Sequence, residues 1–127
     1  MGGDYAPNAV VEGAFDALGQ LPSGDRIVLI GDNRRIREKL ALLDADASLF
    51  EIVPTSQVIE MSDHPAKAFS QKRDSSIAVG FGMLKSGLID GFASAGNTGA
   101  MMVGASYTVN VIPGVYRPAL AALIPNV

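Results

Sequence analysis

The chain has 127 residues, of which 48% are hydrophobic and 18% are charged, and its formal net charge is −3. This length suits a single domain, and the apolar content supports a buried core and argues against disorder. The negative net charge gives no electrostatic reason to expect binding to nucleic acid. The absence of cysteine excludes disulfides, thiolate metal ligands and a cysteine nucleophile, and it fits a reducing compartment. With one histidine, His64, a serine–histidine triad or a multi-histidine zinc site is disfavoured.

No targeting segment is recognisable. The N-terminus lacks the basic and apolar regions of a secretory signal. The apolar stretch 101–112 contains Ser106, Thr108 and Asn110 and stops at Pro113, so it is too short and too polar to cross a bilayer. We therefore expect a soluble, cytoplasmic protein, and no motif predicts a cofactor or a bound metal ion.

Helix and strand patterns alternate in the first half of the chain. A helix is predicted to begin near Pro7 and to end at Gly19. The apolar run 26–31 is typical of a strand that is buried on both faces. Asp32 is a suitable N-cap for the next helix, and residues 48–53 predict a second strand.

The same alternation continues in the second half. Residues 62–65 are a helix-start signature with a proline near the first turn. Residues 74–76 cap a clearer helix, and its apolar stripe consists of Ile77, Phe81, Leu84 and Leu88. A strand is predicted at 90–94, a helix from Thr98, and a last apolar strand at 119–124, ended by Pro125.

This alternation predicts parallel β-α-β units with right-handed crossovers. The expected fold class is α/β, with a Rossmann-like three-layer parallel sheet in one domain that spans residues 1–127. All strands should run in parallel, with helices between them.

The most informative stretch is 90–102, which predicts a buried strand, a tight glycine turn and a helix start. Gly96 and Gly99 bracket Asn97 and Thr98, which are both good capping residues. Gly99 has no Cβ, so a ligand can approach the backbone N–H groups closely. A helix N-terminus presents unpaired N–H donors and a partial positive charge, which suits phosphate. An ordinary strand-to-helix turn would have the same pattern.

Two motifs carry a resemblance to a known family. Residues 1–7, Met-Gly-Gly-Asp-Tyr-Ala-Pro, resemble the start of the bacterial phosphate acyltransferases. Residues 94–100, Ser-Ala-Gly-Asn-Thr-Gly-Ala, resemble that family's central signature. The similarity continues through residues 74–76 and 117–119, and it runs from end to end of the chain with the motifs in the same order.

The resemblance implies an activity and its partners. Members of the family convert acyl-acyl-carrier-protein and inorganic phosphate to acyl phosphate for phospholipid synthesis. Their fold is similar to that of isopropylmalate dehydrogenases and phosphotransacetylases, and they are homodimers. The resemblance also allows peripheral membrane association through a C-terminal part that is absent here.

Two departures from the family pattern suggest an N-terminal part that is truncated at both ends. Family members have a strand of the type Ile-Ala-Val-Asp-Ala ahead of the Met-Gly-Gly-Asp motif, and they continue well past Val127. Without these parts, the chain should expose apolar sheet surface and should dimerise, aggregate or melt easily.

The predicted substrate site lies at the carboxyl ends of the strands, where ligands sit in open α/β sheets. The candidate phosphate-binding residues come from the two glycine motifs: Gly2, Gly3, Asp4, Ser94, Gly96, Asn97, Thr98 and Gly99. For Asp4, a role as a helix cap is slightly favoured, because a carboxylate is an awkward partner for an anion. No residue is assigned as catalytic.

Basic residues form a second candidate set. Lys67, Lys72 and Arg73 are expected either to lie on a solvated helix face or to contact phosphate or the acidic carrier protein. The basic cluster at 34–39 is expected to be surface charge, and His64 is expected to be a helix-start residue and not a base. Met101 and Met102 are expected in the core in preference to lining an acyl chain, although methionine suits either environment.

Two alternative functions remain open at the level of sequence. One is a phosphate- or nucleotide-binding module without catalysis. The other is an enzyme of the same fold that uses coenzyme A, such as a phosphotransacetylase. A nicotinamide-dependent enzyme is weaker, because no Gly-x-Gly-x-x-Gly motif follows a strand.

Overall fold

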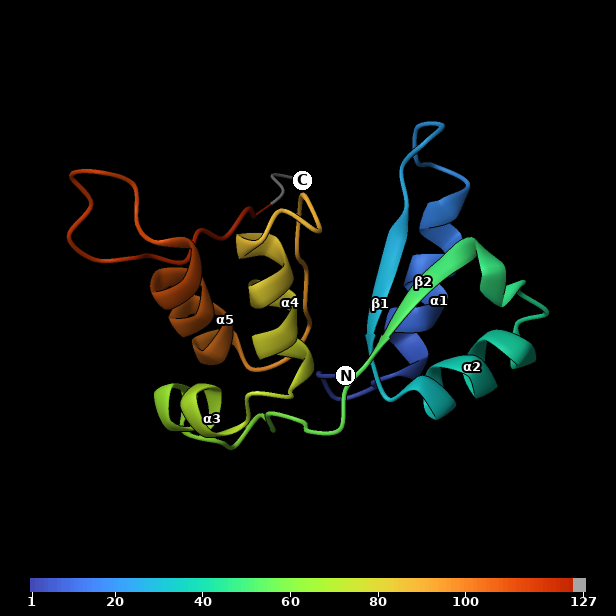
Figure 1. Ribbon diagram of the computed structural model, residues 1–127, viewed down its shortest axis with the longest axis horizontal. Coiled ribbons are helices and arrows are strands. Elements are labelled where there is room, and N and C mark those ends of the chain that lie inside the picture. Colours follow the sequence, from blue (N-terminus) through green and yellow to red (C-terminus); the bar gives the residue numbers. More distant parts are fainter. Residues whose placement is uncertain (125–127) are drawn as a thin grey trace.

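The computed structural model describes residues 1–124 and consists of two halves that lie side by side (Figure 1). The first half contains α1 (Asn8–Leu18), β1 (Ile27–Gly31), α2 (Asn33–Leu42), the short 3₁₀ turn η1 (Ala47–Leu49) and β2 (Phe50–Pro54). The second half contains α3 (Pro65–Gln71), α4 (Ser76–Lys85), α5 (Thr98–Gly104) and the π-helical turn η2 (Ala105–Val109). None of the described helices has the length and apolar character needed to cross a membrane.

The first half is a β-α-β unit with an additional helix. Strands β1 and β2 pair in parallel, with Ile27 opposite Phe50 and Gly31 opposite Pro54. The two helices and the two strands share one core, which consists of the buried residues Val11, Leu29, Ile36, Leu40 and Phe50. The predicted parallel α/β arrangement is therefore confirmed for this half.

The second half has its own core. Its buried residues are Ile59, Ala68, Ile77, Phe81 and Ala100. The ring of Phe81 makes edge contacts with those of Phe69 and Phe92, at centroid distances of 6.3 and 5.2 Å. Met101 packs against this core, as expected, and Met102 is half-buried. The two cores are separate clusters.

Local signals placed the helix starts correctly. Asp32 accepts a hydrogen bond from the N–H of Arg35 (3.1 Å), and Ser75 accepts one from Ala78 (3.3 Å). Asn97 accepts one from Ala100 at 2.9 Å, at the start of α5. Each bond satisfies a donor that has no partner within its helix.

Two predicted strands are wrong for the described chain. Residues 90–94 belong to no helix or strand, and they have no backbone partner, so the sheet has only two strands. A slot of about 760 Å³ lies between residues 88–95 and β1, so the two segments are too far apart for direct backbone pairing. Residues 119–124 also lack strand pairing and are exposed, because no sheet edge lies beside them. Pro125, the expected end of that strand, lies outside the described residues.

Smaller corrections concern element ends. Residues 48–49 belong to η1 and not to a strand, because Asp46 accepts hydrogen bonds from the N–H and hydroxyl of Ser48 and so favours a tight turn. Helix α4 ends at Lys85, because Gly87 adopts a φ of +72° just beyond it. Leu88 is therefore not part of the helical stripe and is 68% exposed.

Candidate functional site

The two glycine motifs touch each other. A Cβ on Gly2 would lie 3.0 Å from the Cα of Gly96, and a Cβ on Gly3 would lie 2.8 Å from the carbonyl oxygen of Ala95. Gly3 also has a φ of +91°, which side chains rarely permit. Glycine is therefore required at both positions for the Gly2–Gly3 loop to pass this close to the turn 95–96.

Met1 attaches the Gly2–Gly3 loop to both halves of the molecule. Its amine donates a hydrogen bond to the carbonyl oxygen of Ile30 at 3.2 Å, at the end of β1. Its carbonyl oxygen accepts a hydrogen bond from the hydroxyl of Ser76 at 2.7 Å, at the start of α4. Burial lowers the pKa of the Met1 amine, and the positive charge of Arg35 lowers it further. The carboxyl end of β1, the start of α4 and the two glycine motifs therefore meet at one place.

Asp4 does not cap α1, so the prediction of a capping role is wrong. The N-cap of α1 is Pro7, and no side chain accepts a hydrogen bond there. A turn precedes the helix, in which the N–H of Ala6 bonds to the carbonyl oxygen of Gly3 at 3.2 Å. The turn moves the helix start away from Asp4, whose side chain is exposed.

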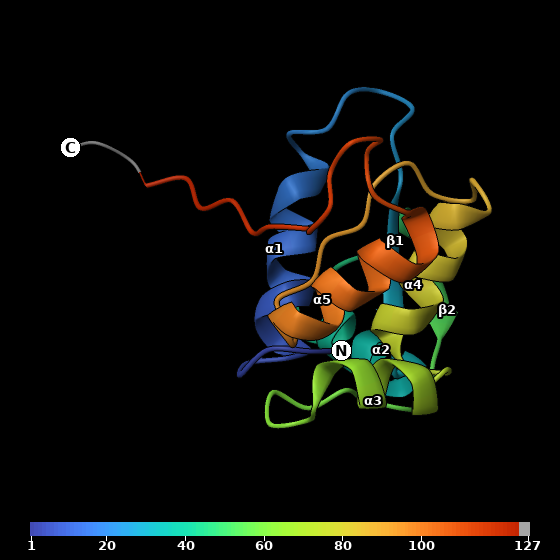
Figure 2. The same cartoon turned by 90° about the vertical axis from the view of Figure 1, so that its left-hand side faces the viewer.

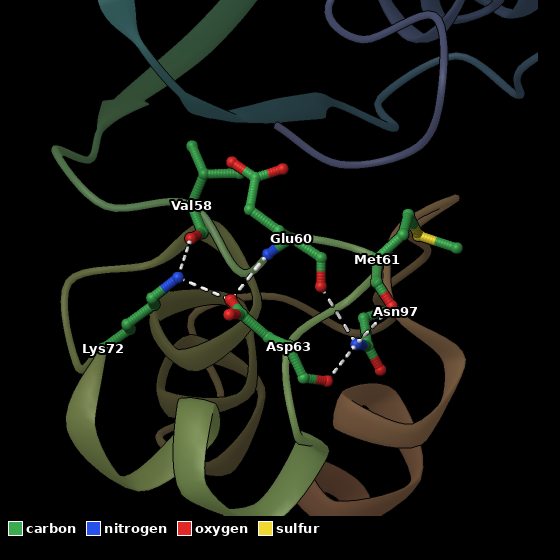
Figure 3. Close-up of polar contacts among 6 residues, drawn as sticks. All are labelled: Val58, Glu60, Met61, Asp63, Lys72 and Asn97. Carbon is green, nitrogen blue, oxygen red and sulfur yellow. Dashed lines mark hydrogen bonds and ion pairs between the residues drawn. The ribbon is translucent and has the colours of Figure 1, made fainter.

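Asn97 is buried, and its carboxamide is engaged within the protein (Figure 3). The Oδ1 atom caps α5, as described above. The Nδ2 group points toward three carbonyl oxygens of the preceding loop, those of Glu60 (3.0 Å), Met61 (3.4 Å) and Asp63 (3.1 Å). In this geometry Asn97 holds the loop 60–63 against the start of α5, and its donors point away from any ligand at the glycine turn.

Lys72 and Asp63 support the same loop (Figure 3). The Nζ atom of Lys72 donates to Asp63 Oδ2 at 2.5 Å and to the carbonyl oxygen of Val58 at 2.8 Å. Asp63 also accepts a hydrogen bond from the N–H of Glu60 at 2.9 Å. These bonds, that from Lys72 first, hold the pKa of Asp63 below its ordinary value. Lys72 is thus engaged inside the protein, whereas Lys67 and Arg73 are exposed.

The remaining candidates lie around the glycine turn. The hydroxyl of Ser94 accepts a hydrogen bond from the N–H of Gly96 at 3.1 Å. Thr98 is exposed, and within residues 1–124 its N–H and that of Gly99 donate to no protein atom. A Cβ on Gly99 would lie 2.4 Å from the Cγ of Pro65. Packing against α3 therefore explains glycine at this position without a ligand, while the two free N–H groups leave room for one.

In the basic cluster at 34–39, Arg34, Arg35 and Arg37 are exposed, as expected, whereas the side chain of Lys39 is only 15% exposed, because it packs beside α1 to reach Glu12. Arg34 and Glu38 form an exposed ion pair at 3.4 Å, and Lys39 pairs with Glu12 on α1. His64 is an exposed N-cap residue whose side chain does not cap α3. In the described part of the chain, no three His, Cys, Asp or Glu side chains gather where they could hold a metal ion.

Three residues of this region were not singled out from the sequence. Asp63 lies within the predicted helix start, but it closes the turn at Glu60 and does not cap α3. The sequence pattern identifies Ser76 only as part of a cap and Pro65 only as a first-turn proline. Asp63 contacts Lys72, 9 residues away, and Ser76 contacts Met1, 75 residues away. No local sequence pattern predicts contacts over such separations.

What the site can do chemically follows from these contacts. It offers backbone N–H donors at the start of α5 and hydroxyls at Ser94 and Thr98; the chain has no cysteine, and its one histidine, His64, is exposed directly before Pro65. Such an arrangement suits the binding and orientation of an anion.

The chain is similar to known proteins over its whole length. The model of a family described as "Fatty acid synthesis protein" matches residues 1–127. A phosphate acyltransferase of Acetivibrio thermocellus is 46% identical over 126 residues, which cover 99% of this chain and 37% of that protein. Phosphate acyltransferases of Anaeromyxobacter dehalogenans (strain 2CP-C) and Magnetococcus marinus are 44% and 41% identical, over 98% and 100% of this chain.

The chain spans only about a third of the length of these relatives, between 34% and 37%. Both glycine motifs fall within the matched region. The family model matches all 127 residues, and the relatives, which are phosphate acyltransferases, are 41–46% identical to this chain. The chain therefore belongs to the fatty acid synthesis protein family.

Proposed function

We propose that this chain is the N-terminal part of a phosphate acyltransferase that converts acyl-acyl-carrier-protein and inorganic phosphate to acyl phosphate. The observation that carries the proposal is the 46% identity over 126 residues to a protein of that name. The contact between the Gly2–Gly3 loop and the turn 95–96 supports it, because it brings both motifs of the sequence resemblance together.

The reaction needs no nucleophile from the enzyme. A phosphate oxygen attacks the thioester carbonyl, the new C–O bond forms, and the C–S bond breaks to release the carrier thiolate, which takes up a proton. The enzyme must hold phosphate close to the carbonyl, stabilise the oxyanion and keep water from the mixed anhydride. This agrees with a site that is rich in N–H donors and lacks cysteine.

Within this proposal, phosphate binds at the glycine turn. The free N–H groups of Thr98 and Gly99 and the hydroxyls of Ser94 and Thr98 are its donors, and Gly2, Gly3 and Gly96 let the backbone come close. Asp4 lies exposed beside them. Asn97 takes part by positioning the turn, since its Nδ2 is engaged with the loop 60–63. Lys67 and Arg73, which are exposed, are the basic residues placed to meet the acidic carrier protein.

The wider architecture is also a proposal. In the longer protein, an apolar strand that leads into Met1 would occupy the slot beside β1 and pair with residues 90–94, which would give the Rossmann-like, isopropylmalate-dehydrogenase-like three-layer sheet. The Met1 amine already donates to the carbonyl oxygen of Ile30, as an amide in a parallel ladder would. Homodimer formation, a cytoplasmic location and peripheral membrane association belong to the same proposal.

The decisive experiment measures acyl phosphate formation by the full-length protein. Purified enzyme is supplied with phosphate and either acyl-acyl-carrier-protein or acyl-coenzyme A, and acyl phosphate is trapped as its hydroxamate. We expect phosphate-dependent product with the carrier-protein thioester. Product from acyl-coenzyme A alone would indicate a phosphotransacetylase-like enzyme. Phosphate binding without product from either donor would indicate a binding module.

A further inference from the structure

The first turn of α4 carries a buried hydroxyl that the helix itself does not use. Ser75 is fully buried and caps α4, since its hydroxyl accepts a bond from the N–H of Ala78 at 3.3 Å. Ser76 is only 5% exposed, and its hydroxyl donates instead to the carbonyl oxygen of Met1 at 2.7 Å. Figure 1 and Figure 2 both show the N-terminus beside the start of α4. The Ser76 bond therefore restrains the segment that follows Met1.

This segment needs a restraint from outside. Gly2 and Gly3 lack a Cβ, so an unrestrained backbone at these positions would sample many conformations. In the structure the loop is held close to the other glycine motif, and a Cβ on Gly3 would lie 2.8 Å from the carbonyl oxygen of Ala95. The carbonyl oxygen that Ser76 binds belongs to the peptide group between Met1 and Gly2. The bond therefore acts directly on the first glycine of the loop, and it does not involve the Met1 amine.

The next residue of α4 packs against the second glycine motif. Ile77 is buried, and its Cδ1 lies 3.4 Å from the position of a Cβ on Gly96. Gly96 in turn lies against Gly2, whose missing Cβ would be 3.0 Å from the Gly96 Cα. Two successive residues of one helical turn thus contact the two motifs, Ser76 through a hydrogen bond and Ile77 through packing. The first turn of α4 therefore sets the separation of the two glycine motifs.

The start of α4 is itself firmly held. Asp74, which precedes the N-cap, accepts hydrogen bonds through Oδ2 from the N–H of Ser56 (2.8 Å) and from its hydroxyl. The carbonyl oxygen of Asp74 accepts a further bond from the N–H of Gln57 at 3.1 Å. These bonds attach the helix start to the segment that follows β2. Loss of the Ser76 hydroxyl should therefore release the glycine loop and leave the helix in place.

We propose that Ser76 is a positioning residue of the anion site, whose hydroxyl holds the Gly2–Gly3 loop at the distance from the turn 95–96 at which phosphate binds. The inference rests on the proposed function, since it takes the anion to be the phosphate that the enzyme uses. Without the hydroxyl, the carbonyl oxygen of Met1 loses its partner and the loop becomes more mobile. Phosphate binding must then also order the loop, which weakens the binding.

The test compares Ser76→Ala with Ser75→Ala in the full-length protein. Each substitution removes one buried hydroxyl from the start of α4, but only the first breaks the bond to Met1. We expect Ser76→Ala to raise the KM for inorganic phosphate about tenfold, as the loss of one hydrogen bond implies, and to change kcat by less than about threefold. Ser75→Ala is the matched control: it should lower the melting temperature through loss of the N-cap and keep the wild-type KM.

KM distinguishes positioning from a purely structural role. A less stable enzyme has a smaller folded fraction, which lowers the apparent kcat but leaves KM unchanged. A double variant then tests whether Ser76 acts through the loop. Gly3→Ala displaces the same loop by another route, so adding Ser76→Ala to it should raise the KM little further, because effects on one shared element are not additive.

Direct binding of inorganic phosphate, measured by isothermal titration calorimetry, separates this inference from the proposed function. A Kd about tenfold weaker in Ser76→Ala supports the positioning role even if neither thioester yields acyl phosphate, in which case the proposed function alone fails. If the wild type makes acyl phosphate and Ser76→Ala keeps its KM, the positioning role is overturned and the proposed function stands.

Three further results would overturn the positioning role. One is a KM raised equally in Ser75→Ala, since the stability of α4 would then explain the effect. The second is a double variant in which the effects of Ser76→Ala and Gly3→Ala multiply, since Ser76 would then act by a route other than the loop. The third is a wild-type protein that binds no phosphate, which would overturn the proposed function as well.

Discussion

Asn97 binds the carbonyl oxygen of Asp63 across 34 residues of sequence, through a hydrogen bond of 3.1 Å from Nδ2, while its Oδ1 caps α5. One side chain therefore fixes both the start of a helix and the loop that packs beside it. These two hydrogen bonds of Asn97 fix the position of the glycine turn that precedes α5, so Asn97 is a positioning residue in the proposed site.

Replacing Asn97 should separate these two roles. Asn97→Ala should lower the free energy of unfolding by about 2–4 kcal/mol, because a lost N-cap costs ~1 kcal/mol and the loss of the part-buried hydrogen bonds to the loop 60–63 adds a similar amount for each bond. Asn97→Ser keeps a capping oxygen but loses the donors to the loop 60–63, so it should fall between the wild type and Asn97→Ala. Urea unfolding followed by circular dichroism measures the difference. Equal stability of the serine variant and the wild type would show that the loop contacts contribute nothing.

The ion pair between Lys72 and Asp63 should make the free energy of unfolding depend on pH in the acidic range. The pKa of Asp63 is lowered in the folded protein from an ordinary value of 3.8, so the carboxylate stabilises the fold above that pH. This stabilisation is lost as the pH falls through the lower folded pKa. Asp46 and Asp74 have lowered pKa values for similar reasons, so the whole protein should lose stability in acid.

A comparison with Lys72→Met isolates this pair. The melting temperatures of variant and wild type should differ at pH 6 and converge as the pH falls through the lowered pKa of Asp63, because the carboxyl group that pairs with Lys72 is then protonated. Lys67→Met is the matched control, because Lys67 is exposed and makes no ion pair in the described structure. A constant difference between Lys72→Met and wild type at all pH values would mean that Lys72 acts through packing and its bond to Val58 alone.

The contact of Gly3 with Ala95 predicts a steep cost for any side chain. Gly3→Ala would force an alanine into a φ of +91° and place its Cβ 2.8 Å from a carbonyl oxygen. We expect a loss of about 1–3 kcal/mol in the free energy of unfolding. Gly13→Ala is the control: Gly13 lies within α1 with nothing within 4 Å of its missing Cβ, so alanine should stabilise the helix by ~0.5–1 kcal/mol. If both variants are equally stable, the two glycine loops do not meet in solution.

The sequence predicted those features that depend on nearby residues. Asp32, Ser75 and Asn97 cap helices through bonds to residues three positions on, so spacing alone revealed them. The apolar run 90–94 also has a strand pattern, but a strand needs a partner, and its neighbour across the slot is too far away. A strand pattern in the sequence therefore predicts a strand only where a partner strand lies close enough to form hydrogen bonds.

Contacts between distant residues could not be predicted in the same way. The link from Lys72 to Asp63 and the close approach of Gly99 to Pro65 join separate elements, and no periodicity encodes them. The sequence predicted Lys72 either on a solvated helix face or in contact with an anion, whereas in the fold its ammonium group binds a carboxylate and a carbonyl oxygen. The sequence shows only the chemical type of such a side chain, whereas the tertiary structure determines its partners.

The role of Gly99 can be tested in the full-length protein if packing is separated from anion binding. Gly99→Val would drive its side chain into Pro65, whose Cγ lies 2.4 Å from the position of a Cβ, so a loss of activity could reflect a displaced α3. The double variant Pro65→Ala, Gly99→Ala relieves most of this clash but still places a methyl group beside the free N–H of Gly99. Pro65→Ala alone is the matched control. We expect the double variant to fold and its KM for phosphate to be about ten- to a hundredfold higher than that of the control, because it loses one or two charged hydrogen bonds. Steady-state acyl phosphate formation against phosphate concentration measures this, with circular dichroism as the check on folding. A folded double variant with the KM of its control would show that Gly99 serves only the packing of α3 against α5.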